Sequence, residues 1–427
     1  METITDLIKD VPIPKFVRIR EKYDHTHIDL TEIPSTIQRE LSRDAISGTI
    51  KPGQRIAITC GSRGISNIAL MSRTVVDFVK SKGAQPYIVA AMGSHGGATA
   101  EGQRQILKDY GITEETMGCP VVSCMETKVI GISDIHHVPV QIDRFAAECD
   151  GILLLNRVKP HTTFRGRWES GLMKMMAIGL GKQAGANDVH HCPPSEMHKA
   201  IEEYGKTILQ NCKILGGIAV VENAYDETCL IQGLSPQEII DKEPELRDYS
   251  YTTIAHLLFP KCDVLVVDKI GKNISGDGMD PNVSGRWPEP RCCSGGIQAE
   301  RCVILDLTDE THGNAHGVGL AEVTTRRLVN KMKLEMTYPT AITNTFLHLM
   351  KIPMIMDNDR EALQLALCTC PEAEDQENLK VIRIPSTAHI DVIEISEGLL
   401  PEAMANPNIE ILSEPYDLPF DENGNLF

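Results

Sequence analysis

Apolar residues recur along the first half of the chain with the spacing of alternating strands and helices. A short apolar run at residues 55–59 leads into the glycine-containing segment CGSRG, and residues 67–82 then carry apolar side chains along one helical face. Gly83 ends that helix, and PYIVAAM gives the next strand. A strand, a helix and a second strand in this order predict a βαβ unit and a parallel sheet.

A second series of strands and helices follows residue 250. CDVLVVDKIG and CVILDL are continuous apolar runs that read as buried strands, and a helix near residues 360–368 precedes the strand VIRIPST. We therefore predict an α/β fold with two α/β domains, mainly parallel sheets and an active-site cleft between the domains. The predicted parts are residues 1–250, residues 251–405, and a tail, residues 406–427, that could pack back on the first domain.

Three loops of the first domain follow predicted strands and carry candidate functional groups. They are centred on Arg63, His95 and His161, the last directly after the apolar run ILLL. Because the carboxyl ends of parallel strands share one edge of a sheet, these loops should converge. The sequence thus predicts one cation and two acid/base groups around a common site.

The stretch Asn156–His198 concentrates further chemistry. It holds four of the chain's 14 histidines, where an average share would be one or two. Lys174 lies among methionines, and desolvation there would disfavour its charged form and make it a better nucleophile. Alternatives exist for each residue alone, because a lone histidine after a strand is commonly a loop residue and a lysine can extend its amine to solvent. The conjunction of these residues favours a functional site.

Composition narrows the class of partner. The net charge of -17 and the 4% aromatic content argue against nucleic acid and against an anionic membrane surface. No apolar run reaches the length of a membrane span, and the first residues lack a signal pattern. The 13 cysteines show no disulfide spacing, so we expect a cytoplasmic protein with free thiols.

The order of the first-domain motifs resembles the nickel-pincer nucleotide-dependent lactate racemase family. The resemblance rests on GSHGGAT, then KPH, then a lysine in a glycine-flanked helix, then a histidine farther along. It covers most of the chain and implies an isomerase, a racemase or epimerase of small 2-hydroxy acids. It also implies a nickel-pincer nucleotide, the pyridinium-3,5-bisthiocarboxylic acid mononucleotide of nickel, which separate cofactor-biosynthesis proteins must supply.

The resemblance gives the residues after His161 their roles toward this cofactor. Lys174 would tether the nucleotide covalently, and His190 would bind the nickel, with His191 as the alternative and His198 more distant. Sulfur and imidazole ligands in a planar arrangement suit Ni(II).

The same resemblance assigns the acid/base chemistry to the loops. His95 and His161 would be the catalytic pair, while Arg63 and Ser62 would contact the cofactor and Arg63 also the substrate. In that family the hydrogen at C2 leaves as hydride and returns to the opposite face. One imidazole then takes the hydroxyl proton and the other returns one, a task that an ordinary imidazole pKa of about 6.5 suits.

Departures from the family pattern point to a substrate other than lactate. Cys60 and Gly64 stand where the family has an acid and a proline, and the spacing from His161 to Lys174 is longer. The loop that follows the first strand of the second domain is largely polar, which suits a polyhydroxylated acid such as gluconate. The predicted substrate contacts are Arg63, Lys272, Asp277, Asp280 and Arg286.

Two other functions remain open at this point. Histidines and acids could bind zinc for hydrolysis, although the sequence has no HExxH motif. A non-catalytic protein could instead bind a small anion through its glycine loops. His312 and His316 could bind a metal, contact substrate or form a structural turn. The sequence leaves the oligomeric state undetermined.

Overall fold

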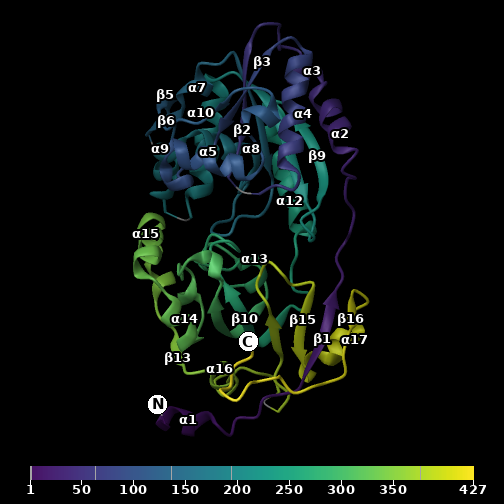
Figure 1. Ribbon diagram of the computed structural model, residues 1–427, viewed down its shortest axis with the longest axis vertical. Helices are drawn as coiled ribbons and strands as arrows, with labels where there is room; N and C mark the ends of the chain where they lie inside the picture. The colour runs from purple at the N-terminus through teal and green to yellow at the C-terminus, as the bar shows by residue number, and fades with distance from the viewer. Residues whose placement is uncertain (1, 63, 136, 194, 376) are drawn as a thin grey trace. The chain divides into compact units, whose positions relative to one another are not determined.

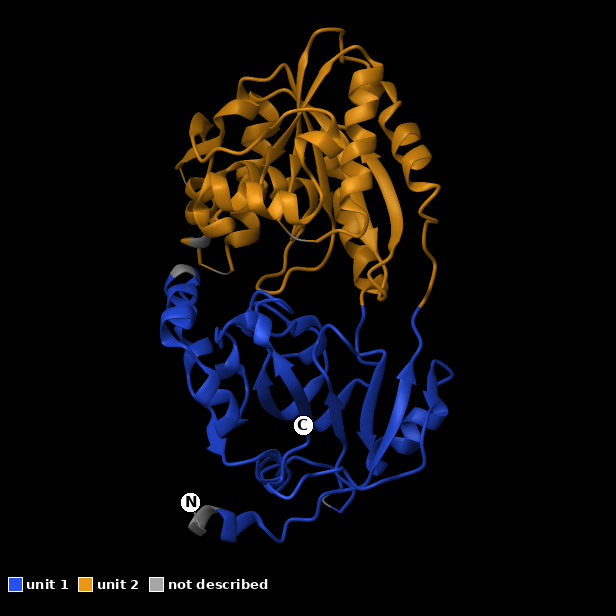
Figure 2. Ribbon diagram, viewed as in Figure 1, with its two compact units in different colours: residues 1–23, 255–427 blue, residues 24–254 orange. Residues whose placement is uncertain are grey.

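The computed structural model describes residues 2–62, 64–135, 137–193, 195–375 and 377–427. These residues form two compact units (Figure 2). Unit 1 consists of residues 1–23 and 255–427, and unit 2 consists of residues 24–254. Each unit is an α/β structure with mainly parallel strands, as the hydrophobic pattern predicted.

Unit 2 is built on a sheet with the strand order β4-β3-β2-β7-β8-β9 among the described residues (Figure 1). All neighbouring strands pair in parallel except β9, which runs antiparallel to β8. A separate antiparallel pair, β5-β6, stands beside it. The bounds are β2 Arg55–Cys60, β3 Gln85–Ala90, β4 Val121–Val122, β5 Thr127–Ile132, β6 Pro139–Asp143, β7 Gly151–Arg157, β8 Ile214–Glu222 and β9 Thr228–Leu234.

Helices cover both faces of this sheet, and β7 shows why its sequence is apolar throughout. Ile152 and Leu154 pack into one hydrophobic cluster, whereas Leu153 and Leu155 pack into the other. The first cluster contains residues of α7 Arg144–Ala147, α8 Gly171–Lys174, the π-helical segment η2 Met175–Leu180, α9 Lys182–His190, α10 Met197–Asn211, α11 Pro236–Asp241 and α12 Glu243–Thr253. The second contains residues of α2 Ile33–Leu41, α3 Asp44–Ser47, α4 Ile68–Ser81, α5 Ala100–Asp109 and α6 Glu114–Met117.

Unit 1 has a larger sheet with the order β13-β12-β11-β10-β14-β15-β1-β16 in the part of the chain that the structure describes. Strands β13 to β14 are parallel, and β15, β1 and β16 are antiparallel to their neighbours. The strands are β1 Phe16–Glu21, β10 Lys261–Ile270, β11 Gln298–Leu307, β12 Val323–Thr325, β13 Met354–Met356, β14 Val381–Ile384, β15 Val392–Ser396 and β16 Ile409–Ile411. The helices are α1 Glu2–Ile8, α13 Pro281–Ser284, α14 Arg326–Lys331, α15 Leu334–Asn344, α16 Asp359–Leu367 and α17 Leu400–Ala405.

The division of the chain differs from the predicted parts at both ends. Residues 1–23, which were expected in the first domain, belong to unit 1 because β1 pairs with β15 and β16. The tail also belongs to unit 1, where the Phe16 amide donates to the Tyr416 carbonyl at 2.8 Å. The backbone groups of β1 therefore find their partners in strands that are far away in the sequence.

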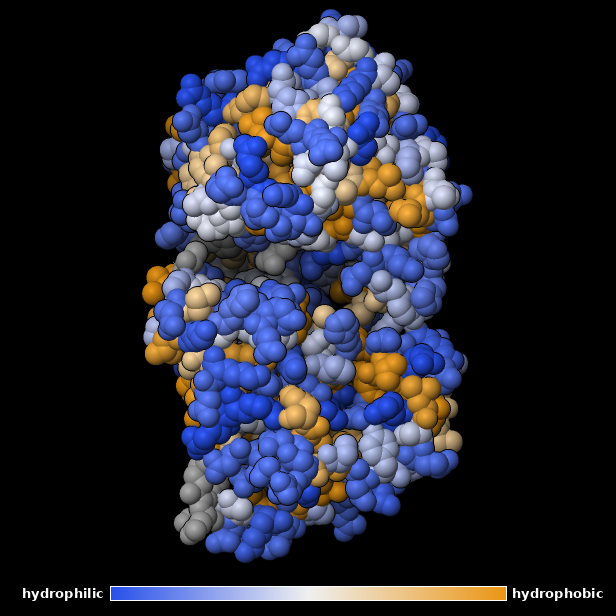
Figure 3. Space-filling model, in the orientation of Figure 1, coloured by the Kyte–Doolittle hydropathy of each residue, from blue (hydrophilic) through white to orange (hydrophobic). Residues whose placement is uncertain are grey.

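Polar residues dominate the surface that Figure 3 shows on both units. Apolar side chains are nevertheless exposed along α15, among them Tyr338 and Ile342. Among the described residues, no helix combines the length and the apolar character that crossing a membrane requires.

Candidate functional site

The predicted site residues of unit 2 follow strands that end at one edge of the sheet. Ser62 follows β2, His95 follows β3 and His161 follows β7, and β2 pairs in parallel with both other strands. Neighbouring strands lie about 4.8 Å apart, so the loops of β3 and β7 start about 10 Å from each other. The Ser62 hydroxyl forms a hydrogen bond with His95 Nδ1, which brings two of the predicted residues together. Arg63 lies outside the described residues.

A buried ion pair anchors the loop that carries His95. The Gln103 side-chain amide donates to the carbonyls of Gly93 at 3.0 Å and His95 at 3.2 Å, and its own oxygen accepts from Lys182 at 3.3 Å. Lys182 Nζ lies 3.0 Å from Asp143 Oδ2, and both side chains are fully buried. Removing either partner would leave an uncompensated buried charge, so this pair fixes the loop strongly.

The helix that carries Lys174 is held at its first residues. The Asn156 side chain, at the end of β7, donates to the Gly171 carbonyl at 2.8 Å. The Glu243 carboxyl accepts from the Met173 amide at 3.2 Å, and burial raises the pKa of Glu243 well above its ordinary value. Lys174 itself is half-buried at the end of α8.

The π-helical segment that follows Lys174 packs directly on the glycine loops. The Gly93 amide donates to the Gly179 carbonyl at 3.2 Å. A Cβ added to Gly93 would lie 3.1 Å from the Ile178 side chain, and one added to Gly61 would lie 3.2 Å from the Met175 methyl group. Short π-helical segments are frequent at functional sites. The chain that begins at Lys174 therefore touches the loops that carry Ser62 and His95.

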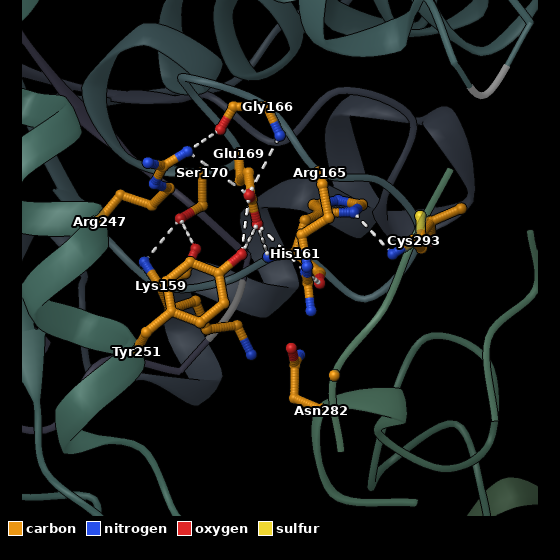
Figure 4. A network of polar contacts seen from close by, with 12 residues as sticks. Lys159, His161, Arg165, Gly166, Glu169, Ser170, Arg247, Tyr251, Asn282 and Cys293 are labelled. Atoms are coloured by element: carbon orange, nitrogen blue, oxygen red, sulfur yellow. Dashed lines mark hydrogen bonds and ion pairs between the residues drawn. The ribbon is translucent and has the colours of Figure 1, made fainter. Parts of the chain in front are cut away.

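The His161 loop is organised by Glu169, a buried carboxylate that sequence reasoning missed (Figure 4). Glu169 accepts hydrogen bonds from the His161 amide at 2.8 Å, the Gly166 amide at 3.1 Å and the Tyr251 hydroxyl at 2.9 Å. The guanidinium of Arg165 lies 3.3 Å from the same carboxylate. Burial, together with the neighbouring Glu169 charge, raises the pKa of Tyr251, so the phenol remains a donor.

The His161 ring is oriented by its own loop. Its Nδ1 accepts a hydrogen bond from the Thr163 amide at 3.1 Å. The ring also stacks on Phe164, with the centroids 4.1 Å apart. A half-buried imidazole with two such contacts has one preferred orientation.

The candidate nickel ligands lie at the end of α9. His190 is the last residue of that helix, and its side chain is not among those described. His191 is exposed, and its Nδ1 lies 2.7 Å from the Asn187 carbonyl. A carbonyl only accepts, so Nδ1 carries the proton and Nε2 offers its lone pair. Metal-bound imidazoles commonly make this contact.

The third candidate, His198, differs from His191. It lies on α10, where its Nδ1 is buried without a hydrogen-bond partner among the described residues. Lys174 is half-buried and His191 offers a ring nitrogen, so each has the chemistry that the tether or the imidazole ligand of a nickel-pincer nucleotide would need. Among the described residues, no three His, Cys, Asp or Glu side chains gather as a metal site of the protein alone.

Three of the predicted substrate residues share the loop after β10 in unit 1. The Lys272 amine donates to the Gly276 carbonyl, and Asp280 caps α13 by accepting from the Asn282 amide at 2.8 Å. Asp277 Oδ1 lies 3.2 Å from the Nε2 of His316, which is buried. His316 therefore has a structural contact within this loop region.

Arg286 lies near the amino ends of the parallel strands of unit 1, opposite the loop that follows β10. Its guanidinium contacts Glu322 at 3.0 Å and the Ala299 carbonyl at 3.0 Å, near the amino ends of β12 and β11. There it lines a cavity of about 630 Å³, together with Lys261 and Lys380. The structure therefore separates Arg286 from Lys272, Asp277 and Asp280.

Comparison with known proteins finds a solved structure with a similar fold and a family model that matches part of the sequence. The solved lactate racemase apoprotein from Thermoanaerobacterium thermosaccharolyticum matches with a TM-score of 0.55 at 15% identity, over 87% of this chain and 99% of that chain. The chain has a lactate racemase-like fold. Residues 64–230 also match a family described as a domain of unknown function, DUF362. No curated protein matches the chain.

Proposed function

We propose that the protein is an isomerase, a racemase or epimerase that inverts C2 of a 2-hydroxycarboxylic acid. The observation that carries the proposal is the gathering of Ser62, His95 and the Lys174 helix around one sheet edge, at which the His161 loop also begins. The likeness to a lactate racemase apoprotein supports the same reading. A hydroxy acid needs one acid/base group on each face of C2, and two imidazoles meet that need.

We further propose that the protein works with a nickel-pincer nucleotide tethered to Lys174. His190, or His191 as the alternative, would supply the imidazole ligand to nickel, and Ser62 and Arg63 would contact the nucleotide. When bound, this group supplies a centre that accepts hydride from C2. Cofactor-biosynthesis proteins would have to provide it.

The residues of the chain would manage the proton of the substrate hydroxyl. His95 and His161 would each hold or release that proton at a ring nitrogen, one for each configuration of C2. Gln103 and Glu169 would keep the two loops in place, because each binds backbone groups of one loop. Arg63 would pair with the carboxylate of the substrate.

We propose an aldonate such as gluconate as the substrate class, larger and more polar than lactate. The polar loop after β10 supports this choice, because Lys272 and Asp280 can hydrogen-bond several hydroxyl groups. Asp277 is buried against His316, so its part would be to hold the shape of this loop. Arg286 is bound to Glu322 at the other edge of the sheet, so we do not include it among the substrate contacts.

Isomerisation assays on protein from cells with and without the cofactor-biosynthesis proteins test the proposal. Gluconate, malate and lactate would each be followed by chiral chromatography. We expect C2 inversion only in the first preparation, fastest with gluconate, together with a mass increase on Lys174. Equal activity in both preparations would exclude the cofactor, and a preference for lactate would exclude the aldonate assignment.

A further inference from the structure

We propose that the outward face of helix α15 pairs with the same face of a second copy of this chain, so that the protein forms a twofold-symmetric dimer through unit 1. The inference goes beyond the proposed function and does not depend on it. It rests on the placement of α15 Leu334–Asn344, whose polar side lies against the protein and whose apolar side is exposed.

The inner face of α15 is polar. Thr337 is fully buried, and its hydroxyl accepts a hydrogen bond from the Ala315 amide at 3.1 Å. The Thr340 hydroxyl accepts from the Asn314 side chain at 3.2 Å, and the buried Ala341 beside them is small. Hydrogen bonds to the loop after β11 therefore hold this helix in place, and no large apolar stripe is used on that side.

The outer face of the same helix is apolar. Leu334, Tyr338 and Ile342 are four residues apart, so they lie on one side of the helix, and they are 46%, 48% and 69% exposed. No charged residue occurs from residue 336 to residue 347, where the chain's average of 24% would place about three. Surface helices usually turn their apolar stripe toward the core. The reversed placement of α15 favours a partner that covers this stripe.

The apolar surface continues beyond the helix. Leu347 and Ile352 are also exposed, as is Met354, the first residue of β13, which is an edge strand of the unit 1 sheet in the part of the chain that the structure describes. Seven of the 17 large apolar residues that are exposed among the described residues fall within residues 334–354. Figure 3 shows apolar atoms on the flank of unit 1 where Figure 1 places α15. Such a concentration, next to a sheet edge, marks a surface for association.

The size and the spacing of this surface fit a second copy of the chain. At about 200 Å² for a fully uncovered large side chain, the α15 stripe and its continuation expose about 650 Å² per copy, close to the roughly 800 Å² that a standard interface takes from each partner. In an antiparallel pair of helices centred on Tyr338, Leu334 faces the partner's Ile342, because each lies four residues from the centre. One self-complementary stripe thus supplies both halves of a twofold contact.

Sedimentation velocity of the full-length protein tests the dimer. We expect a species of twice the chain mass at micromolar concentrations. Ile342→Glu should weaken the association by about 100-fold or more, because each copy would bring an unpaired charge into an apolar contact. A protein that is monomeric at every concentration would overturn the proposal and assign the stripe to a different partner.

Met404→Glu is the matched control, because Met404 is 72% exposed on α17 and Ile342 is 69% exposed on α15. Both variants should keep the thermal unfolding of the wild type, which circular dichroism measures, since neither side chain is buried. Only Ile342→Glu should dissociate the dimer. Equal effects of the two substitutions on the association would overturn the assignment to α15.

A double variant tests the antiparallel pairing. In Leu334→Glu/Ile342→Lys the new charges of opposite sign would meet across the twofold axis, whereas each single variant brings only one kind of charge into the contact. The double variant should therefore dimerise more tightly than either single variant. A double variant that associates as weakly as the worse single one would overturn this pairing of the helices.

The salt dependence distinguishes an apolar contact from one made by ion pairs. Two chains with a net charge of -17 each repel one another at long range. Raising the salt concentration from about 0.1 M to about 1 M shortens the Debye length from about 10 Å to about 3 Å, so the repulsion falls and the dimer should become tighter. Dissociation at the higher salt concentration would overturn the apolar contact.

Discussion

Glu169 gathers four donors on a side chain that is 1% exposed. In Glu169→Gln the amide nitrogen faces donors instead of accepting from them. We therefore expect a loss of about 2–4 kcal/mol in the free energy of unfolding, since one partner of a buried charged network is removed. Activity should fall further than stability explains, because the His161 loop loses its anchor. Urea denaturation and kcat of the loaded enzyme measure the two effects.

A surface carboxylate provides the comparison for Glu169. Glu202 pairs with Lys206 four residues along α10 at 2.5 Å, with both side chains partly exposed. Glu202→Gln should lower the free energy of unfolding by only about 0.3–0.5 kcal/mol and leave kcat unchanged. A Glu169→Gln protein as stable and active as this control would contradict the role of Glu169.

Alanine variants of the three cofactor candidates separate the nickel ligand from the tether. Lys174→Ala should abolish the covalent mass increase. His190→Ala or His191→Ala should keep the mass increase and lose most of the nickel, and only one of the two should do so. Intact-mass spectrometry and metal analysis of the same sample read both quantities. A mass increase that persists in Lys174→Ala would exclude that residue as the tether.

At the residue scale, the sequence identified the side chains that project from the ends of strands. Ser62 and His95 could be placed together because the carboxyl ends of parallel strands share an edge. Glu169 and Lys182 could not be found, because each is an isolated charge without a repeating pattern around it. Their burial depends on partners such as Tyr251 and Asp143, which are 82 and 39 residues away (251 − 169 and 182 − 143).

At the scale of elements, the contact between the π-helical segment and the His95 loop requires a glycine. Gly93 has a φ of +58°, and an added Cβ would meet Ile178 at 3.1 Å. Gly93→Ala should therefore cost about 1–2 kcal/mol for the left-handed backbone and about 1–3 kcal/mol more for overpacking. The displaced loop should lower kcat as well. Chemical denaturation and turnover measure these effects.

Gly53 is the control for backbone strain alone. Its φ is +81°, and an added Cβ would meet nothing within 4 Å. Gly53→Ala should show the backbone cost without the packing cost and without a change in kcat. If Gly93→Ala were no worse than Gly53→Ala, the loop would not depend on the π-helical segment.

Hydrophobic spacing predicted the helices at residues 67–82 and 360–368 well, because the structure has α4 Ile68–Ser81 and α16 Asp359–Leu367 there. It did not predict the switch from α8 to the π-helical segment at Met175, because the same apolar residues satisfy both geometries. The short strands β1 and β16 were also missed. Neither strand is buried along its whole length, so its apolar pattern is weak, and hydrogen bonding to strands far away in the sequence determines its structure.

At the scale of the whole molecule, pH should affect stability through Glu21, next to the first connection between the units. Burial raises the pKa of Glu21 from 4.5 to about 7, against the opposing hydrogen bonds from Tyr23 and the Leu258 amide. The folded protein then holds a proton that the unfolded chain releases. The stability from this group is fully present below pH 4.5 and is lost as pH rises through about 7.

Glu21→Gln removes this titration and keeps an acceptor for the Leu258 amide. The free energy of unfolding of the variant minus that of wild type should therefore rise by about 3 kcal/mol between pH 4.5 and pH 8. Denaturant titrations at both pH values measure it. A difference that stays constant with pH would mean that Glu21 has an ordinary pKa in the folded protein.

The pairing of β1 decides how the molecule can be divided. β1 lies between β15 and β16, so residues 255–427 alone would lose an internal strand. We expect this fragment to have a much lower unfolding temperature than the intact protein. Residues 24–254 should fold alone and, if Lys174 is the tether, still acquire the mass of the cofactor. Joining residues 1–23 to residues 255–427 through a short Gly-Ser linker should restore cooperative unfolding, since residues 23 and 255 belong to the same unit. Thermal unfolding followed by circular dichroism compares the three fragments. Equal unfolding temperatures of residues 255–427 with and without residues 1–23 would show that β1 is dispensable. The absence of a cooperative unfolding transition in residues 24–254 would show that unit 2 does not fold alone.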